Sequence, residues 1–158
     1  MKKLIFVLVG VLAFAGTLAL ADSATEQEVK KTIIDSNVYI KKHLKAPAGD
    51  YSKEGAIEFW SSGGMMQVID ANGRPDEFES VNIDVKHIRV TTLVPGKVAM
   101  AHYYSEGSMK PKGSAAVSNY RTRVSQVYVK EDGKWKVRAS HWSPIAGGSG
   151  TSQTAQTE

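Results

Sequence analysis

A small set of polar side chains lies among apolar residues in the C-terminal half of the chain, where three predicted strands could bring them together. The set consists of His102, Tyr104, Tyr120, Gln126 and His141. An apolar pocket with a few converging polar groups is the usual form of a small-molecule site. Tyr and His also occur in ordinary cores with one satisfied hydrogen bond each, so both interpretations stay open.

Strand periodicity predicts which side chains face such a pocket, because successive residues of a strand point to opposite sides. We expect the more apolar alternate set of each strand to face inward. These sets are Val98, Met100, His102, Tyr104 and Glu106; then Tyr120, Val124, Gln126 and Tyr128; and finally Trp135, Val137, Ala139 and His141. Met100, Trp60 and Val124 are predicted to line the pocket, while His141, Tyr104 and Tyr120 orient the ligand.

Other kinds of chemical site have little support in the sequence. The histidines at 43, 87, 102 and 141 are scattered and show no His-x-x-x-His spacing, so no metal site is predicted. No Gly-x-Ser-x-Gly motif and no phosphate-binding loop occurs, and no cofactor is predicted. The chain has no Cys, which excludes disulfides and thiolate catalysis.

The composition is that of one ordinary globular domain. The chain has 158 residues, of which 42% are hydrophobic and 23% charged. This balance argues against a disordered chain, a coiled coil or a multi-span membrane protein. The formal net charge of +4 becomes +2 once Lys2 and Lys3 are set aside with the predicted signal described next. Such a charge is too weak to predict a nucleic-acid partner.

The first 21 residues have the pattern of an export signal. Two lysines precede an uncharged run from Leu4 to Ala21, which ends in a small-x-small motif, Ala19-Leu20-Ala21. We therefore expect cleavage after Ala21 and a periplasmic or secreted location. An uncleaved membrane anchor is the alternative, since the run just reaches spanning length. Otherwise the sequence predicts no membrane contact.

Helical periodicity occurs only before residue 63, and strand-like segments follow. The sequence predicts a helix over about 24–45, a short second helix over 53–62, and strands at 65–71, 81–93, 97–106, 116–130 and 135–143, with a bulge near 86–88. The tail over 147–158 is predicted to be disordered. This order predicts an α+β fold with helices on one face of an antiparallel sheet.

Three segments resemble the nuclear transport factor 2-like (NTF2-like) superfamily, which includes SnoaL-like and ketosteroid isomerase-like proteins. They are Ala48-Gly49-Asp50, the Val-Ile-Asp-Ala-Asn-Gly run at 68–73, and the hairpin from Val127 to Val137. The chain is similar to DUF4440-type proteins and to the association domain of calcium/calmodulin-dependent kinase II. That domain has a comparable hairpin, followed by a His and a Ser where this chain has His141 and Ser143.

The resemblance, which covers about residues 24–146, implies a cone-shaped domain over 22–146. In such a fold, two to three N-terminal helices pack on a curved sheet of about five strands and leave a pocket on its concave side. It also implies a homodimer formed through the sheet face. Tyr104 and Gln126 fall where the kinase domain has pocket arginines, so the resemblance carries no anion site over to this chain.

The resemblance also suggests a catalytic alternative. Ketosteroid isomerase chemistry needs a carboxylate base and an acidic donor in an apolar cavity. Asp70 matches the base position by its local pattern, and Tyr39 is a possible phenol donor. Asp before Asn-Gly is also an ordinary turn residue. The sequence thus favours an exported, non-catalytic, dimeric small-molecule-binding protein, with an isomerase or dehydratase and an assembly module as the alternatives.

Overall fold

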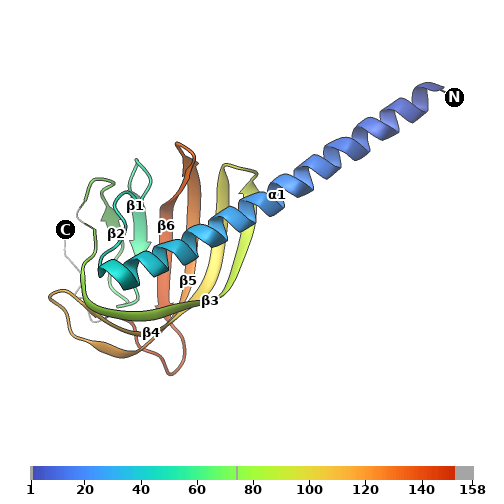
Figure 1. Ribbon diagram of the computed structural model, residues 1–158. Helices are drawn as coiled ribbons and strands as arrows, with labels where there is room; N and C mark the ends of the chain where they lie inside the picture. The colour runs from blue at the N-terminus through green and yellow to red at the C-terminus, as the bar shows by residue number, and fades with distance from the viewer. Residues whose placement is uncertain (1, 74, 152–158) are drawn as a thin grey trace.

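The computed structural model describes residues 2–73 and 75–151, with side chains described from residue 22 onward. The described residues form one helix and a six-stranded sheet (Figure 1). The elements are α1 (Lys2–His43), β1 (Ala56–Phe59), β2 (Gln67–Ile69), β3 (Phe78–Val94), β4 (Val98–Pro111), β5 (Val117–Glu131) and β6 (Lys134–Pro144). The α+β class is confirmed, although this single helix stands where the sequence predicts two to three.

The sheet has the order β2-β1-β6-β5-β4-β3 and is mixed. Strands β3 to β6 form an antiparallel meander, β1 lies parallel to β6, and β2 pairs antiparallel with β1. Shifts in register interrupt the pairing of β3 with β4, of β4 with β5 and of β5 with β6. Bulges of this kind bend and twist a sheet, and here they help to curve it around α1 (Figure 1).

Helix α1 is longer than predicted, because it runs without a break from Lys2 to His43. It ends where Leu44 adopts a left-handed conformation with φ of 54°. Val29 and Ile33, which are 0% and 3% exposed, lie on the side that packs against the sheet. The predicted signal, residues 1–21, lies outside the residues whose side chains are described. Among the residues with described side chains, no helix is long and apolar enough to cross a membrane.

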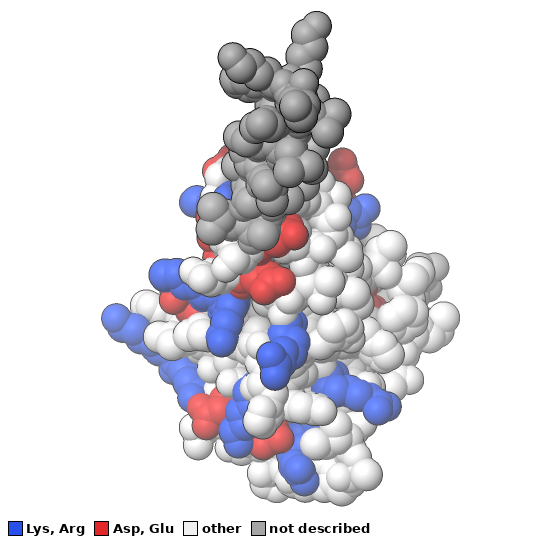
Figure 2. All heavy atoms as spheres, turned by 90° about the vertical axis from the view of Figure 1, so that its right-hand side faces the viewer, with Lys and Arg blue, Asp and Glu red and all other residues white. Residues whose placement is uncertain are grey.

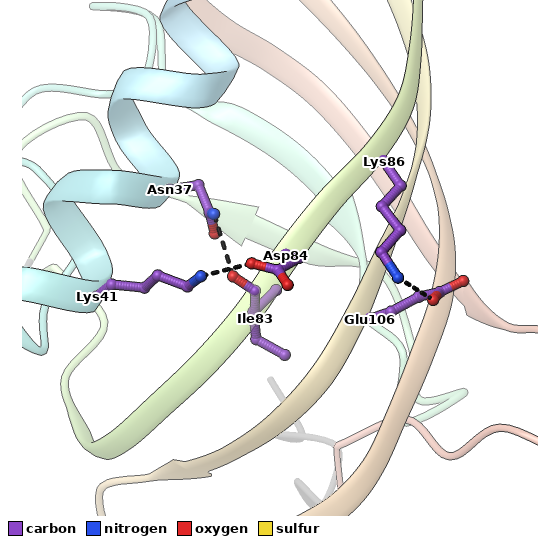
Figure 3. A network of polar contacts seen from close by, with 6 residues as sticks. All are labelled: Asn37, Lys41, Ile83, Asp84, Lys86 and Glu106. Atoms are coloured by element: carbon purple, nitrogen blue, oxygen red, sulfur yellow. Dashed lines mark hydrogen bonds and ion pairs between the residues drawn. The ribbon is translucent and has the colours of Figure 1, made fainter.

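Polar contacts fix the second half of α1 on β3 (Figure 3). The Asn37 side-chain amide donates to the carbonyl oxygen of Ile83 at 3.1 Å, and Lys41 pairs with Asp84 at 2.6 Å. On the outer side of the sheet, Lys86 pairs with Glu106 of β4 at 3.0 Å. Figure 2 shows acidic and basic side chains interspersed over the visible face. Ion pairs this exposed contribute little to stability, so the amide contact and the apolar packing position the helix.

The predicted helix over 53–62 is wrong. Its central residues form strand β1, with Ala56 and Glu58 buried and Ile57 and Phe59 exposed. This period of two is the strand pattern, and pairing with both β6 and β2 outweighs the weak helical spacing of Ile57 and Trp60.

The face predicted for the strand over 97–106 is also wrong. The buried residues of β4 up to residue 106 are Ala99, Ala101, Tyr103 and Ser105. Met100, His102 and Tyr104 therefore lie on the outer face, together with Val98 and Glu106. Small Ala side chains let α1 approach β4 closely, and they face inward for that reason rather than for their hydrophobicity.

The last strand follows the prediction only in its first half. Trp135 and Val137 are buried as expected, but a register shift opposite Val127 and Tyr128 places one extra residue in β6. Beyond this bulge the two faces are exchanged. His141 is therefore exposed, whereas Ser140 is buried. By contrast, the predicted inward face of β5 is confirmed, and the predicted bulge near 86–88 occurs between Lys86 and Arg89.

The start of the predicted disordered tail is held in place. Ser149 bridges to Tyr120 as an extra strand-like residue beside β5, and Thr151 donates its backbone N–H to the Ser61 hydroxyl at 3.1 Å. Residues 152–158 lie outside the described part of the chain.

Gly107 is the position where the sheet depends most on a missing side chain. Its φ is +146°, and a Cβ there would lie 2.0 Å from the carbonyl oxygen of Asn82 on β3. We predict that Gly107→Ala lowers the free energy of unfolding by about 3 kcal/mol or more. Gly133→Ala is the control, because Gly133 also has positive φ but open space around it, and it should cost about 1 kcal/mol. Urea unfolding of both variants tests this, and equal losses would contradict it.

Candidate functional site

A cavity of about 490 Å³ lies between the second half of α1 and the concave face of the sheet. Thr32, Ser36, Asn37 and Ile40 line it from the helix. The sheet supplies apolar and aromatic walls, listed here by strand: Val81, Ile83 and Val85; Tyr103 and Met109; Tyr120 and Tyr128; Trp135, Val137 and Trp142. Thr151 of the C-terminal segment completes the lining beside Ser61. An interior space of this size accommodates a small organic molecule.

Glu58 is the most deeply buried carboxyl group in the lining among the described residues, at 4% exposed. Its carboxylate accepts hydrogen bonds from the Trp60 indole at 2.9 Å, from the Tyr51 hydroxyl at 3.4 Å and from the Ser140 hydroxyl. Burial raises the pKa of Glu58, and the nearby Asp76 carboxyl raises it further, against the lowering effect of the three donors. The alternation of β1 therefore places a buried carboxyl group with a raised pKa inside the cavity.

Asp50 forms a second carboxyl site at the end of α1. Its Oδ2 accepts a hydrogen bond from the Ser36 hydroxyl at 3.0 Å. Burial raises the pKa of Asp50, while the Ser36 hydrogen bond and the nearby Lys136 ammonium act in the opposite direction. The backbone of Asp50 is itself fixed, since its carbonyl accepts the N–H of Val137 at 2.8 Å.

Gln126 lies at the centre of a third polar group. Its side-chain carbonyl accepts the hydroxyl hydrogens of Tyr103 and Tyr128, each at 2.7 Å. Burial raises the pKa of both phenols well above its usual range, so both stay protonated and donate. Because Gln126 is held through its oxygen, its amide NH₂ is left without a hydrogen-bond partner among the described residues.

Three of the residues predicted for the site do line the cavity. They are Trp60, Tyr120 and Gln126. Val124 is buried in the core but is absent from the cavity lining. Met100, His102, Tyr104 and His141 lie on the outer face of the sheet, where the Nδ1 of His102 lies 3.0 Å from the Ser125 hydroxyl. The expected convergence of His102, Tyr104 and His141 inside the pocket is therefore wrong, for the register reasons given above.

The two catalytic candidates lie outside the cavity. Asp70 is exposed, and its carboxylate accepts the backbone N–H of Asn72 at 2.8 Å, the bond of an ordinary Asx turn. Tyr39 packs against the His43 ring with centroids 4.2 Å apart and is not among the lining residues. The geometry thus favours the turn interpretation of Asp70. No described group of three or more His, Asp or Glu side chains is arranged to hold a metal ion.

Sequence reasoning missed Glu58, Asp50, Tyr51 and Tyr103. For Glu58 the sequence carries no signal, because a single glutamate between Ile57 and Phe59 is typical of a surface position. For Tyr103 the signal was the small residues Ala99 and Ala101 at the same spacing. Asp50 and Tyr51 follow a loop, and no periodicity indicates where loop side chains point.

The chain matches the family model of the SnoaL-like domain over residues 43–147. It is similar in structure to an NTF2-like protein of unknown function from Pseudomonas putida KT2440, with a TM-score of 0.54 and 16% identity, over 77% of this chain and 87% of that chain. None of the curated proteins gives a match. The chain therefore belongs to the SnoaL-like domain family, and it has the NTF2-like fold.

Two further solved structures are more distant. An NTF2-like protein of unknown function from Prochlorococcus is 20% identical over 69% of this chain and 77% of that chain, with a TM-score of 0.43. The association domain of the C. elegans calcium/calmodulin-dependent kinase II is 12% identical over 75% of this chain and 98% of that chain, with a TM-score of 0.46.

Burial of Glu58 should make stability depend on pH. Its folded pKa lies above the unfolded value, so the folded protein binds more protons between the two values, and stability falls as pH rises through that window. We predict that Glu58→Gln removes this part of the decline, so the variant gains stability relative to wild type between pH 4 and pH 8. Urea unfolding at both pH values tests this, with Glu79→Gln at the surface as the control for a lost charge. A difference between Glu58→Gln and wild type that is the same at both pH values would contradict it.

Proposed function

We propose that this protein is an exported, non-catalytic SnoaL-like protein that binds a small organic molecule in the cavity between α1 and the sheet. The observation that carries the proposal is the cavity itself, about 490 Å³ in volume, with Glu58 and Gln126 presented from its walls. A protein gains no stability from a space of this size, because unfilled volume forfeits packing contacts. A bound ligand best explains why the folded protein contains such a cavity.

The arrangement of the lining supports binding rather than mere loose packing. The polar groups are held by specific hydrogen bonds, three to Glu58 and two to Gln126, and do not simply point into solvent. Aromatic and aliphatic side chains together provide most of the remaining walls. Fixed polar groups on a mainly apolar surface give a ligand both affinity and a defined orientation.

Export by cleavage after Ala21 is consistent with how α1 is anchored. The Asp22 carbonyl accepts the Thr92 hydroxyl at 3.2 Å, and the Thr25 hydroxyl accepts the Gly96 N–H at 2.8 Å. Both contacts lie beyond the predicted cleavage point, so the mature chain keeps them. We therefore propose that the ligand is met in the periplasm or outside the cell.

Exposed apolar side chains on β1 and β2 favour a homodimer formed through the outer face of the sheet. Ile57, Phe59 and Val68 are 40%, 46% and 70% exposed on neighbouring strands. The Phe59 ring also lies edge-on to His141, with centroids 5.7 Å apart. An apolar group of this kind is typical of the core of a subunit interface.

A catalytic alternative also rests on Glu58. A buried carboxyl with a raised pKa beside the Tyr51 hydroxyl is suited to moving a proton on a bound substrate, as an isomerase or dehydratase requires. In that case Glu58, and not Asp70, is the base. Glu58→Gln then abolishes turnover while a bound molecule is retained, whereas a simple binding protein shows no turnover to lose.

Filling the cavity tests the binding proposal. Ser105 is 3% exposed and lines the cavity, so Ser105→Phe places a ring inside it. We predict that native mass spectrometry of wild-type protein, purified without denaturation from its own compartment, shows a retained small molecule that Ser105→Phe lacks. Ser118→Phe, on the exposed side of β5, is the matched control and should keep the molecule. Circular dichroism verifies folding, and equal retention by all three proteins would place the molecule elsewhere.

Charge at the apolar outer face tests the dimer. We predict that Phe59→Lys raises the dimer dissociation constant by about tenfold to a hundredfold, because it buries an unpaired ammonium in the interface. Analytical ultracentrifugation measures the change, and Lys53→Ala on the adjoining loop is the control. A monomeric wild-type protein, or an unaffected variant, would contradict this interface.

A further inference from the structure

We propose that the cavity selects a small organic cation, a protonated amine that also carries an oxygen acceptor. This inference rests on the proposed binding function and adds the chemical class of the ligand. Three features of the lining carry it: the charges, the aromatic rings and the free amide of Gln126.

The charges facing the cavity are mostly of one sign. Asp50, Glu58 and Asp76 all line it. Among the described lining residues the one cation is Lys112, at 69% side-chain exposure, and it is paired with Glu77 at 2.6 Å. Lys136 approaches Asp50 from outside, but its ammonium donates to the Gly49 carbonyl. The interior therefore repels an anion and attracts a cation.

Aromatic rings stand beside these carboxyl groups. Tyr51 and Trp60 both donate to Glu58, so their rings are held next to its carboxylate. Trp142 lies almost perpendicular to Tyr103, at 88° with centroids 6.1 Å apart. The faces of Trp and Tyr rings attract cations, most strongly where water is excluded. A wall of aromatic rings with carboxyl groups beside them is therefore suited to binding an ammonium group.

The Gln126 amide is an independent sign of a ligand. Gln126 is 7% exposed and lines the cavity, and its oxygen is occupied by two phenols. Its NH₂ group has no acceptor among the described residues. The NH₂ group keeps some exposure on the cavity side, so a ligand oxygen can accept its hydrogen bond. This donor accounts for the oxygen acceptor in the proposed ligand.

An amine also fits the energetics of the carboxyl groups better than the other classes of ligand. A neutral apolar molecule would desolvate Glu58 and Asp50 further without supplying a charge, and a carboxylate would add repulsion. An ammonium group within a few ångströms stabilises the ionised carboxylate that burial otherwise disfavours. Both the binding free energy and the balance of charge in the cavity therefore favour an amine.

Three probes that share one ring and differ in the charge of the tail test the inference. They are tyramine, 4-ethylphenol and 4-hydroxyphenylacetate, which are cationic, neutral and anionic at pH 7.5. Titration calorimetry with the mature protein, freed of any retained molecule, measures their affinities. We expect tyramine to bind at least about tenfold more tightly than 4-ethylphenol. We expect 4-hydroxyphenylacetate to bind most weakly.

Variants locate the effect. Glu58→Gln and Asp50→Asn should each reduce the preference for tyramine over 4-ethylphenol severalfold. Asp132→Asn removes the same charge from the exposed β5–β6 turn and should leave the preference unchanged. Because 4-ethylphenol keeps the ring and the oxygen, its binding to the two cavity variants also shows that the cavity is still formed.

Tighter binding of 4-ethylphenol or 4-hydroxyphenylacetate than of tyramine would overturn the amine inference while leaving cavity binding in place. Failure of all three probes to bind would also overturn it. Cavity binding itself is judged separately, by whether Ser105→Phe loses the retained molecule. If both Glu58→Gln and Asp50→Asn keep the preference for tyramine, residues other than these two recognise the ammonium group, which would contradict the inference.

Discussion

The packing of α1 across β3 and β4 is the contact on which the shape of the molecule depends. Val29 of the helix shares one buried cluster with Ala99 and Ala101 of β4, and Asn37 donates to the Ile83 carbonyl of β3. The sheet curves through its bulges while α1 stays straight, so the two cannot remain in contact along their whole length (Figure 1). Where the sheet bends away from the helix, Thr32, Ser36 and Ile40 line the cavity, whereas Asn37 keeps α1 in contact with β3 through Ile83. The cavity is thus a geometric consequence of a straight helix on a curved sheet.

Burying the polar groups inside this cavity costs free energy, and hydrogen bonds to nearby residues hold each of these groups in place. Glu58 has donors from the loops before and after β1 and from β6, while Asp50 has Ser36 of α1. Removing a donor would leave a buried carboxylate less well satisfied, which costs more than the hydrogen bond itself contributes. Elements that are distant in sequence therefore depend on each other through the cavity walls. A hydrophobic lining would be the more stable solution, and the proposed ligand would offset the cost of burying these carboxyl groups.

The sequence was sufficient to predict the class of fold, the antiparallel meander and the inward face of β5. Those predictions depend on long, regular patterns, and the face of β5 is further marked by Arg121 and Arg123, whose charges oppose burial. The failures fall where regularity is interrupted. One extra residue in β6 exposes His141, and the choice of Ala99 and Ala101 as the inward set exposes His102 and Tyr104. Alternation fixes two possible faces for a strand, but the partner packed against it decides which one is buried.

The same reasoning explains why the candidate site was only partly predictable. Tyr120 and Gln126 were predicted because they lie on the regular inward face of β5, whereas Trp60 lines the cavity although the sequence predicts a helix there. Glu58 was not predicted, because a single acidic residue in a four-residue strand is typical of a surface position until the neighbours of that strand are known. β1 lies between β2 and β6, and this placement turns Glu58 inward. Membership of the SnoaL-like family determines the fold that encloses the cavity. The chemistry of the cavity depends on individual lining residues such as Glu58, which can differ between proteins without changing the fold.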